Sequence, residues 1–207
     1  RTTGLTLGDR TILGTLTCNK SLFTADDVGR HIRLQLETRW TWVKITAFSS
    51  STSVDVQIME PLPRATRDIT RYADDGSTSK FRLGAWSATT GWPRVVTFFE
   101  QRAVFASTTT QPQTLWMSVT DDYENHAPTE LGSSVVDTNG VTYTIATPEV
   151  NAIQWMSSGQ TLLIGTSGAE YQVRASSTVN EPVTARNIFV TRQGTHGSLP
   201  GAKSLYI

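Results

Sequence analysis

Two stretches of the chain share one pattern of apolar and polar residues: VVTFFEQRAVFASTTTQPQTLWMSV at residues 95–119 and AIQWMSSGQTLLIGTSGAEYQVRA at residues 152–175. Each contains two short apolar runs separated by a polar turn, then a loop of small and polar residues and a third run with an aromatic residue. Short runs rich in β-branched and aromatic residues, bounded by turn residues, predict β-strands. We therefore expect each stretch to form strands joined in sequence by hairpins.

A constant offset of 58 residues relates the two stretches, and it aligns Val104 with Leu162 and Thr108 with Thr166. The polar turns between the first two runs coincide as well. A deletion of three residues in the following loop would then align Trp116 with the aromatic residue of the second stretch, Tyr171. The alignment indicates an internal repeat. The alternative interpretation is that two unrelated β-meanders share a general pattern.

A fourth strand would complete the first unit. The dipeptide Asn139-Gly140 favours a type I′ turn, which predicts a hairpin between residues 135–136 and residues 141–143. Four-stranded units repeated along a chain are typical of propeller blades. The sequence KSLYI at residues 203–207 would begin a third unit, so the predicted propeller is incomplete.

The first third of the chain predicts a different all-β module. Strands are expected near residues 11–17, 31–37, 40–48 and 53–59. In the second of them Ile32, Leu34 and Leu36 alternate with polar residues, as in a strand with one buried face. Helical periodicity is nearly absent, and TADDVG is the exception, because Thr24 can cap a helical turn there. We expect a small antiparallel barrel or sandwich.

Turn chemistry separates the two parts of the chain. Two prolines and the sequence ADDGSTS interrupt the strand pattern, which places a module boundary between residues 60 and 85 and, by preference, after Lys80. The prediction is therefore a small β-module at residues 1–80 and a propeller-like region at residues 81–207. The repeat units of that region are expected at about residues 86–145 and 146–200.

Composition excludes several classes of protein. The 207 residues carry 18 basic and 18 acidic side chains, and a neutral chain gains little affinity for nucleic acid from counterion release. No apolar run is long enough for a membrane-spanning helix, so no membrane insertion is expected. The single cysteine, Cys18, permits no disulfide within the chain and is expected to be a small core or strand residue. The start lacks both methionine and an apolar signal sequence, which indicates a fragment.

The polar residues give no catalytic constellation. The three histidines, His31, His126 and His196, are far apart and lack the spacing of zinc ligands. The acidic sequence DDYEN at residues 121–125 has carboxylates for calcium or for glycoside hydrolysis, but its spacing is not that of an EF-hand loop. We interpret it as a polar turn between strands. We expect no enzymatic activity, no metal and no cofactor.

The tryptophans are the remaining functional signal. Trp40 and Trp42 lie two residues apart on a predicted strand, so they share one face, and Arg39 and Lys44 beside them are charged. Exposed aromatic rings can stack on sugars, bases or partner proteins. Trp40 and Trp42 are therefore the predicted interaction surface, although structural roles are expected for most of the six tryptophans.

An ordered string of motifs resembles a known family. It runs as Trp-Ser, Gly-Trp-Pro, Gln-Arg, Pro-Gln-x-x-Trp-x-Ser and Asp-Tyr-Glu-Asn between residues 86 and 125. Over about residues 81–175 the chain resembles the tail nozzle, or tail tubular protein B, family of short-tailed phages and prophages. The first eighty residues, with LFTADDVGRHIRL, resemble a small β-domain inserted in such proteins and named after ubiquitin-activating enzymes. That domain name implies no chemistry here.

The resemblance implies a non-enzymatic structural protein of the virion tail, assembled in the host cytoplasm. It would form a homo-oligomeric ring, a hexamer, that continues the DNA channel and helps to retain or release the genome. Its partners would be further tail proteins, such as the adaptor and the fibres, with passive contact to genomic DNA in the lumen. The alternative function is a carbohydrate-binding adhesin or receptor-binding module, which the tryptophan-rich strands would suit.

Overall fold

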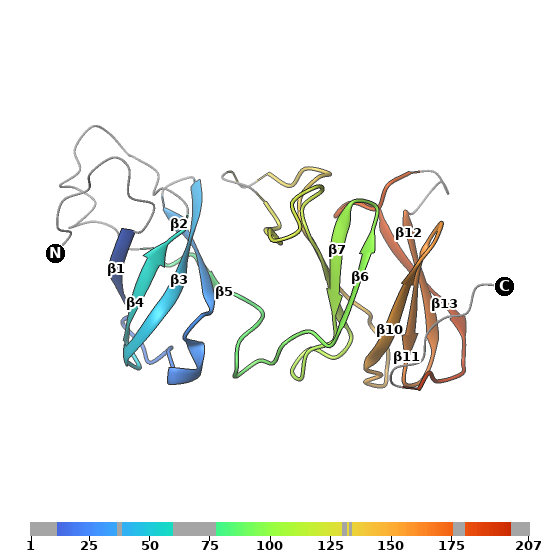
Figure 1. The fold of residues 1–207 in the computed structure, drawn as a ribbon, viewed down its shortest axis with the longest axis horizontal. Coiled ribbons are helices and arrows are strands. Elements are labelled where there is room, and N and C mark those ends of the chain that lie inside the picture. Colours follow the sequence, from blue (N-terminus) through green and yellow to red (C-terminus); the bar gives the residue numbers. More distant parts are fainter. Residues whose placement is uncertain are drawn as a thin grey trace. The chain divides into compact units, whose positions relative to one another are not determined.

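The chain is all-β, as predicted, and its described residues form three antiparallel sheets and one short 3-10 helix (Figure 1). The computed structural model describes residues 12–36, 39–59, 78–129, 132, 134–175 and 181–199. The chain divides into two compact units, the first with residues 1–89 and 131–133 and the second with residues 90–130 and 134–207. Most of the predicted boundary segment, residues 60–77, and the sequence KSLYI lie outside the described residues.

The first unit contains a five-stranded sheet in the order β1-β4-β3-β2-β5. Four strands match the prediction closely, and β5 adds residues beyond Lys80 to this sheet by pairing with β2. No pairing joins the two edge strands among the residues described, so the sheet stays open and forms no closed barrel there. The strands are β1 (Ile12–Thr17), β2 (His31–Leu36), β3 (Arg39–Ser50), β4 (Ser53–Ile58) and β5 (Phe81–Leu83).

One face of this sheet is buried. The alternation in β2 places Ile32 and Leu34 inward, as predicted, while Leu36 is only half-buried. Phe23, from the segment before the helical turn, packs into the same cluster. Cys18 is half-buried beside this cluster, as expected for a small apolar residue. The buried members of the cluster are Phe23, Ile32, Leu34, Val43, Ile45, Val54 and Val56.

The predicted helical turn is the 3-10 helix η1 (Ala25–Asp27), and the Asp27 carboxylate holds it in place. One carboxylate oxygen accepts the backbone N–H of Thr24 at 2.9 Å and the Thr24 hydroxyl at 3.1 Å. The other accepts Arg30 Nη1 at 2.7 Å. Burial by itself would raise the pKa of this carboxyl, but the hydrogen bonds from Thr24 and Arg30 outweigh it and lower the pKa below 3.8.

We expect Asp27→Asn to lower the free energy of unfolding of the first unit by about 1–3 kcal/mol at pH 7, because the charged acceptor of these bonds is lost. A carboxyl with a lowered pKa in the folded state stabilises the fold above its unfolded-state pKa. That contribution disappears as the pH falls through the lower folded-state value. Urea unfolding between pH 7 and pH 2 should therefore show the difference between the two proteins shrinking in acid. A constant difference would contradict this account.

The second unit contains two four-stranded sheets, which match the predicted repeat units. Their orders are β6-β7-β8-β9 and β10-β11-β12-β13, each a simple meander. The first sheet has β6 (Val95–Phe99), β7 (Arg102–Ala106), β8 (Thr114–Met117) and β9 (Val141–Thr144). The second has β10 (Ile153–Ser158), β11 (Leu162–Thr166), β12 (Glu170–Ala175) and β13 (Ile188–Gly194).

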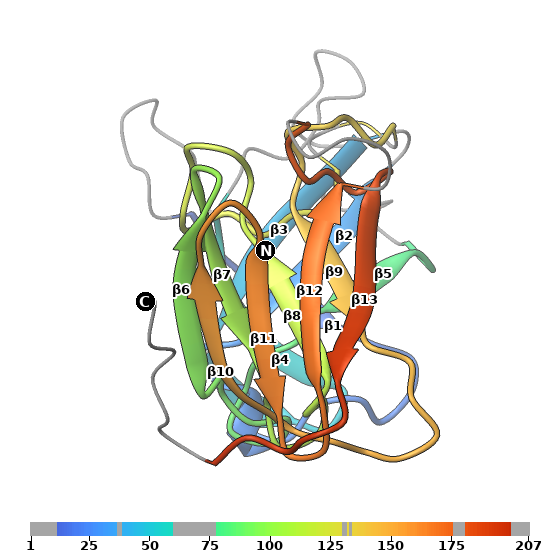
Figure 2. The same ribbon diagram turned by 90° about the vertical axis from the view of Figure 1, so that its right-hand side faces the viewer.

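The two sheets stack with the same strand order and the same strand direction (Figure 2). At one end Ile153, where β10 begins, donates its N–H to the Pro112 carbonyl in the turn beside the start of β6, at 2.9 Å. At the other end Glu100, just after β6, accepts the N–H of Val183, which lies in the connection from β12 to β13, at 2.6 Å. Because β12 runs parallel to β10, both contacts require β6 and β10 to run the same way.

This stacking corrects the alignment of the repeat by one residue. When two sheets are related by a translation, equivalent side chains point in the same direction. Val104 of the first sheet and Leu162 of the second are both buried in the one hydrophobic core that the two sheets share, so these side chains point in opposite directions. The equivalent of Leu162 is therefore Ala103. The alignment of Trp116 with Tyr171 is retained, because these residues occupy the same register position opposite β7 and β11, respectively.

The offset of 58 residues is correct in the next turn of each repeat, between β7 and β8 and between β11 and β12. Thr108 accepts the N–H of Gln111 through its hydroxyl at 3.0 Å, and Thr166 accepts the N–H of Ala169 in the same way at 3.0 Å. The one-residue change in offset falls at Ser107, which has a left-handed φ of 63°. This single extra residue accounts for the difference between the two repeats.

The turn between β6 and β7 uses two left-handed residues, Glu100 with φ 47° and Gln101 with φ 60°. Two consecutive positive φ values match the type I′ geometry that suits the twist of a hairpin. Arg102, predicted to lie in the turn, is instead the first residue of β7.

We expect Gln101→Gly to raise the free energy of unfolding by about 0.5–1 kcal/mol, because glycine has no Cβ to strain at positive φ. Gln160, in the equivalent turn of the second sheet, provides the matched control, since its φ is not positive. Gln160→Gly should instead lower stability through the larger entropy of the unfolded chain. Chemical denaturation of both variants measures the comparison, and the same sign for both would refute it.

The hairpin predicted at Asn139-Gly140 does not form. Neither residue has a positive φ, and β9 pairs with β8 rather than with residues 135–136. The Asn139 side chain accepts the N–H of Val136 at 2.8 Å, which closes a different turn. Gly140 is needed for space, since a Cβ there would lie 2.7 Å from the carbonyl carbon of His126. The dipeptide therefore reflects close packing instead of left-handed backbone.

Candidate functional site

The predicted interaction surface lies on the outward face of the first unit's sheet. In β3 the inward positions are Thr41 and Val43, so Trp40 and Trp42 point to the opposite face, as their spacing predicted. Trp42 is 37 % exposed and Trp40 is half-buried. The two indoles therefore share an accessible surface.

Two residues of β2 complete this surface. The register places Arg33 opposite Trp42, and the Arg33 guanidinium lies 4.7 Å from the centroid of the Trp40 ring. The His31 ring lies 5.3 Å from the Trp42 ring, centroid to centroid. Sequence analysis missed both residues, although the alternation of β2 assigns them to the polar face. We call His31, Arg33, Trp40 and Trp42 the tryptophan face.

Burial and charge set the electrostatics of the tryptophan face. Burial lowers the pKa of His31, and the ammonium group of Lys44 opposite it lowers the pKa further. Burial also lowers the pKa of Arg33, which nevertheless remains a cation in proteins. The face therefore presents flat rings and fixed cations, with a neutral imidazole at pH 7. Such a surface can stack on a sugar or base and attract an anionic group.

We expect Trp42→Ala to move the pKa of His31 upward toward its ordinary value of 6.5, because removal of the indole hydrates the imidazole. Leu13→Ala is the control, since Leu13 is exposed on β1 and has no ring contact with His31. An NMR titration of the His31 ring protons measures both variants. An unchanged pKa in Trp42→Ala would mean that other groups dehydrate the imidazole.

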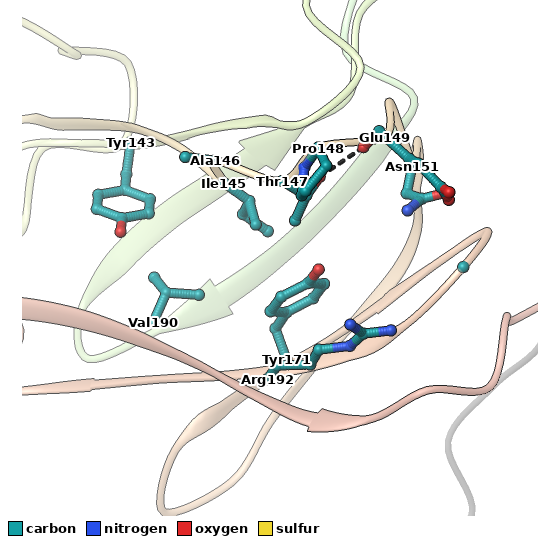
Figure 3. Close-up of a pocket in the computed structure, with 11 residues that line it drawn as sticks. Tyr143, Ile145, Ala146, Thr147, Pro148, Glu149, Asn151, Tyr171, Val190 and Arg192 are labelled. Carbon is teal, nitrogen blue, oxygen red and sulfur yellow. Dashed lines mark hydrogen bonds between the residues drawn. The ribbon is translucent and has the colours of Figure 1, made fainter.

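The second unit contains a cleft of about 470 Å³ between its two sheets (Figure 3). Tyr143 of β9 lines one side, and Tyr171 and Arg192 of the second sheet line the other. Glu149 and Asn151, from the connection between the sheets, complete its polar rim. The first strands, β6 and β10, approach most closely, and the cleft opens beside the last strands. The two sheets thus form a wedge, as neighbouring propeller blades do.

Arg102 is a buried residue whose role the sequence did not reveal. It is 3 % exposed, and its guanidinium donates to backbone carbonyls near both ends of the β8–β9 connection. Nη1 contacts the carbonyl oxygen of Ser118 at 2.6 Å and that of Asn139 at 2.7 Å, while Nη2 contacts that of Asp137 at 2.7 Å. Burial lowers the pKa of Arg102, and the neighbouring Glu100 opposes this effect. Arg102 therefore fastens the long β8–β9 connection to the start of β7.

The acidic sequence DDYEN forms a turn after β8, in agreement with its interpretation as a polar turn. Asp121 has a left-handed φ of 62°, and Val119 bridges to Asp122. The carboxylates of Asp121, Asp122 and Glu124 are exposed and make no ion pair with the described residues.

The histidines lie in separate places. His31 belongs to the tryptophan face, His126 packs on Phe105 with the ring centroids 5.4 Å apart, and His196 lies in the loop after β13. Nowhere in the described part of the chain do three His, Cys, Asp or Glu side chains gather as metal ligands. The described residues also include no helix that is long and apolar enough to cross a membrane.

The chain matches no protein-family model, and a search of curated proteins finds no match.

Proposed function

We propose that this chain is a non-enzymatic structural component of a phage or prophage tail, in the nozzle or head-tail tube. The supporting observation is the pair of stacked four-stranded sheets, because it agrees with the propeller-like repeats expected over the region that carries the family motifs. The motif string supplies the link to tails. In this proposal the two sheets, which share one core, act as a rigid element of the channel wall.

In this proposal the protein forms a ring, a hexamer, that continues the DNA channel and helps to hold or release the genome. Its partners are the adaptor, the fibres and further copies of itself, and its location is the virion tail. The balance of 18 basic and 18 acidic residues suits a wall along which DNA slides, since a strongly basic lumen would retain it.

Electron microscopy tests the proposal. Antibodies raised against the chain should label the tails of purified particles, and the purified parent protein should form rings with a central channel. A stable monomer that is absent from purified particles would refute it.

The second candidate function is carbohydrate binding, which the tryptophan face favours. Trp42 is exposed and lies beside Arg33, whose guanidinium stacks on the indole of Trp40. Such an arrangement can bind an acidic or neutral sugar. A glycan array should then show saturable binding that Trp42→Ala abolishes. Phe48→Ala is the matched control, because Phe48 is an aromatic residue of the same strand with a similar exposure of 38 %. Equal binding by both variants would exclude the tryptophan face as the glycan site.

A further inference from the structure

The first sheet of the second unit exposes an apolar surface on the side away from the second sheet. Val96 is 57 % exposed and Phe98 is 61 % exposed. Tyr123 packs edge-on against Phe98, with 5.3 Å between the ring centroids, and Phe105 pairs with Val96 in the register. We call Val96, Phe98, Phe105 and Tyr123 the phenylalanine face. Large exposed apolar side chains gathered in one place mark interaction sites.

The repeat shows what such a face is built to contact. By the corrected alignment Phe105 corresponds to Ile164, and Val96 corresponds to Met156. Both of these second-sheet residues pack into the shared core, against the sheet that precedes them. In the second sheet, the equivalent positions are covered by a neighbouring four-stranded sheet. The phenylalanine face therefore has the position at which the first sheet could be covered in the same way.

The second sheet presents a complementary surface on its own outward side. Leu163 and Arg174 point away from the shared core, and the Arg174 guanidinium lies 5.6 Å from the centroid of the Phe189 ring. Phe189 is 42 % exposed. Arg174 is only half-buried, so the guanidinium cation on this outward side can pair with a carboxylate of a partner.

Charge complementarity favours a second copy of this chain as the partner. If the stack continues in register, β12 of one copy lies over β8 of the next. Arg174, near the end of β12, then lies over the acidic turn that follows β8. That turn carries the exposed carboxylates of Asp121, Asp122 and Glu124 beside the phenylalanine face.

We propose that copies of this chain associate head to tail, with the outward face of β10–β13 in one copy packed on the phenylalanine face of the next. Arg174 pairs with the acidic turn across this contact. Such a heterologous contact joins unlike surfaces and builds rings or open filaments. This contact would lie between neighbouring subunits of the proposed ring, and only the closure of that ring rests on the proposed function.

Sedimentation velocity of the purified chain over a range of concentrations tests the contact. We expect reversible association, weakened about tenfold or more by Phe98→Ser and by Arg174→Glu. Leu13→Ser is the control, since Leu13 is 63 % exposed in the first unit and should leave association unchanged. Circular dichroism and the unfolding midpoint verify that each variant folds. If Arg174→Glu does not fold, Phe189→Ser is used in its place.

Mixing the two variants identifies the geometry. Phe98→Ser keeps a sound Arg174 face and Arg174→Glu keeps a sound phenylalanine face, so the mixture should form one-to-one dimers that grow no further. Association that neither variant affects would overturn the proposal. So would a monomer at all concentrations that Phe98→Ser destabilises, because Phe98 would then be covered within its own chain. Antibody labelling of virion tails could still succeed after either result. The head-to-tail contact and the tail function can therefore fail independently.

Discussion

Arg102→Met should lower the free energy of unfolding of the second unit by about 3–5 kcal/mol. The guanidinium is buried and donates to carbonyls on both flanks of the β8–β9 connection, at Ser118 and at residues 137–139. Methionine fills a similar volume but leaves these carbonyls without a donor, and each buried unsatisfied acceptor costs about 1–3 kcal/mol. Because Arg102 connects several segments, the loss should also release the connection itself.

Arg94→Met is the matched control for Arg102→Met. Arg94 lies just before β6 and is exposed, so its replacement should change stability by no more than about 0.5 kcal/mol. Urea unfolding measures both variants, and amide hydrogen exchange of residues 134–140 reports the release of the connection. A loss below about 1 kcal/mol for Arg102→Met would mean that water replaces the guanidinium as donor.

Ile164→Ala is the second large effect that we expect, a loss of about 2–5 kcal/mol. Ile164 is fully buried in the core that both sheets of the second unit share. The cavity that Ile164→Ala leaves therefore removes contacts from β6–β9 as well as from β10–β13. Hydrogen exchange should show faster exchange of the Val104 and Leu115 amides along with those of β11.

The control for this cavity lies in the first unit. Ile45 is equally buried, but it belongs to the separate cluster of the five-stranded sheet. Ile45→Ala should accelerate exchange in β2–β4 and leave β6–β13 unchanged. If Ile164→Ala accelerated exchange only within β10–β13, the two sheets would not unfold as one cooperative unit.

Sequence patterns predicted the strands better than the contacts between them. The alternation around Ile32 and Leu34 indicates a strand with one buried face whatever its partners are, so β1–β4 could be located. Trp40 and Trp42 were placed on one face for the same reason. Their contacts with Arg33 and His31 depend on the register of β2 against β3, and no local pattern fixes that register.

Arg102 and Asn139 show where sequence reasoning failed. A charged residue next to a glutamate and a glutamine indicates a turn. Arg102 is nevertheless buried, because backbone carbonyls up to 37 residues away accept hydrogen bonds from its guanidinium. Asn139-Gly140 is a strong hairpin signal, but tertiary packing against His126 explains the glycine. The repeat was shifted by one residue because a single left-handed residue, Ser107, is invisible to an alignment of residue types.

The meander order of the second unit has a consequence for synthesis of the chain. Every strand pairs with its neighbour in sequence, so each hairpin forms as soon as its second strand emerges. The first sheet is complete at Thr144, but the strands that cover Val104 and Leu115 end at Ala175. At ribosomal rates of about 5–20 residues per second, this apolar face stays open to water and chaperones for a few seconds. The contact between Glu100 and Val183, which spans 83 residues, can form only after that interval.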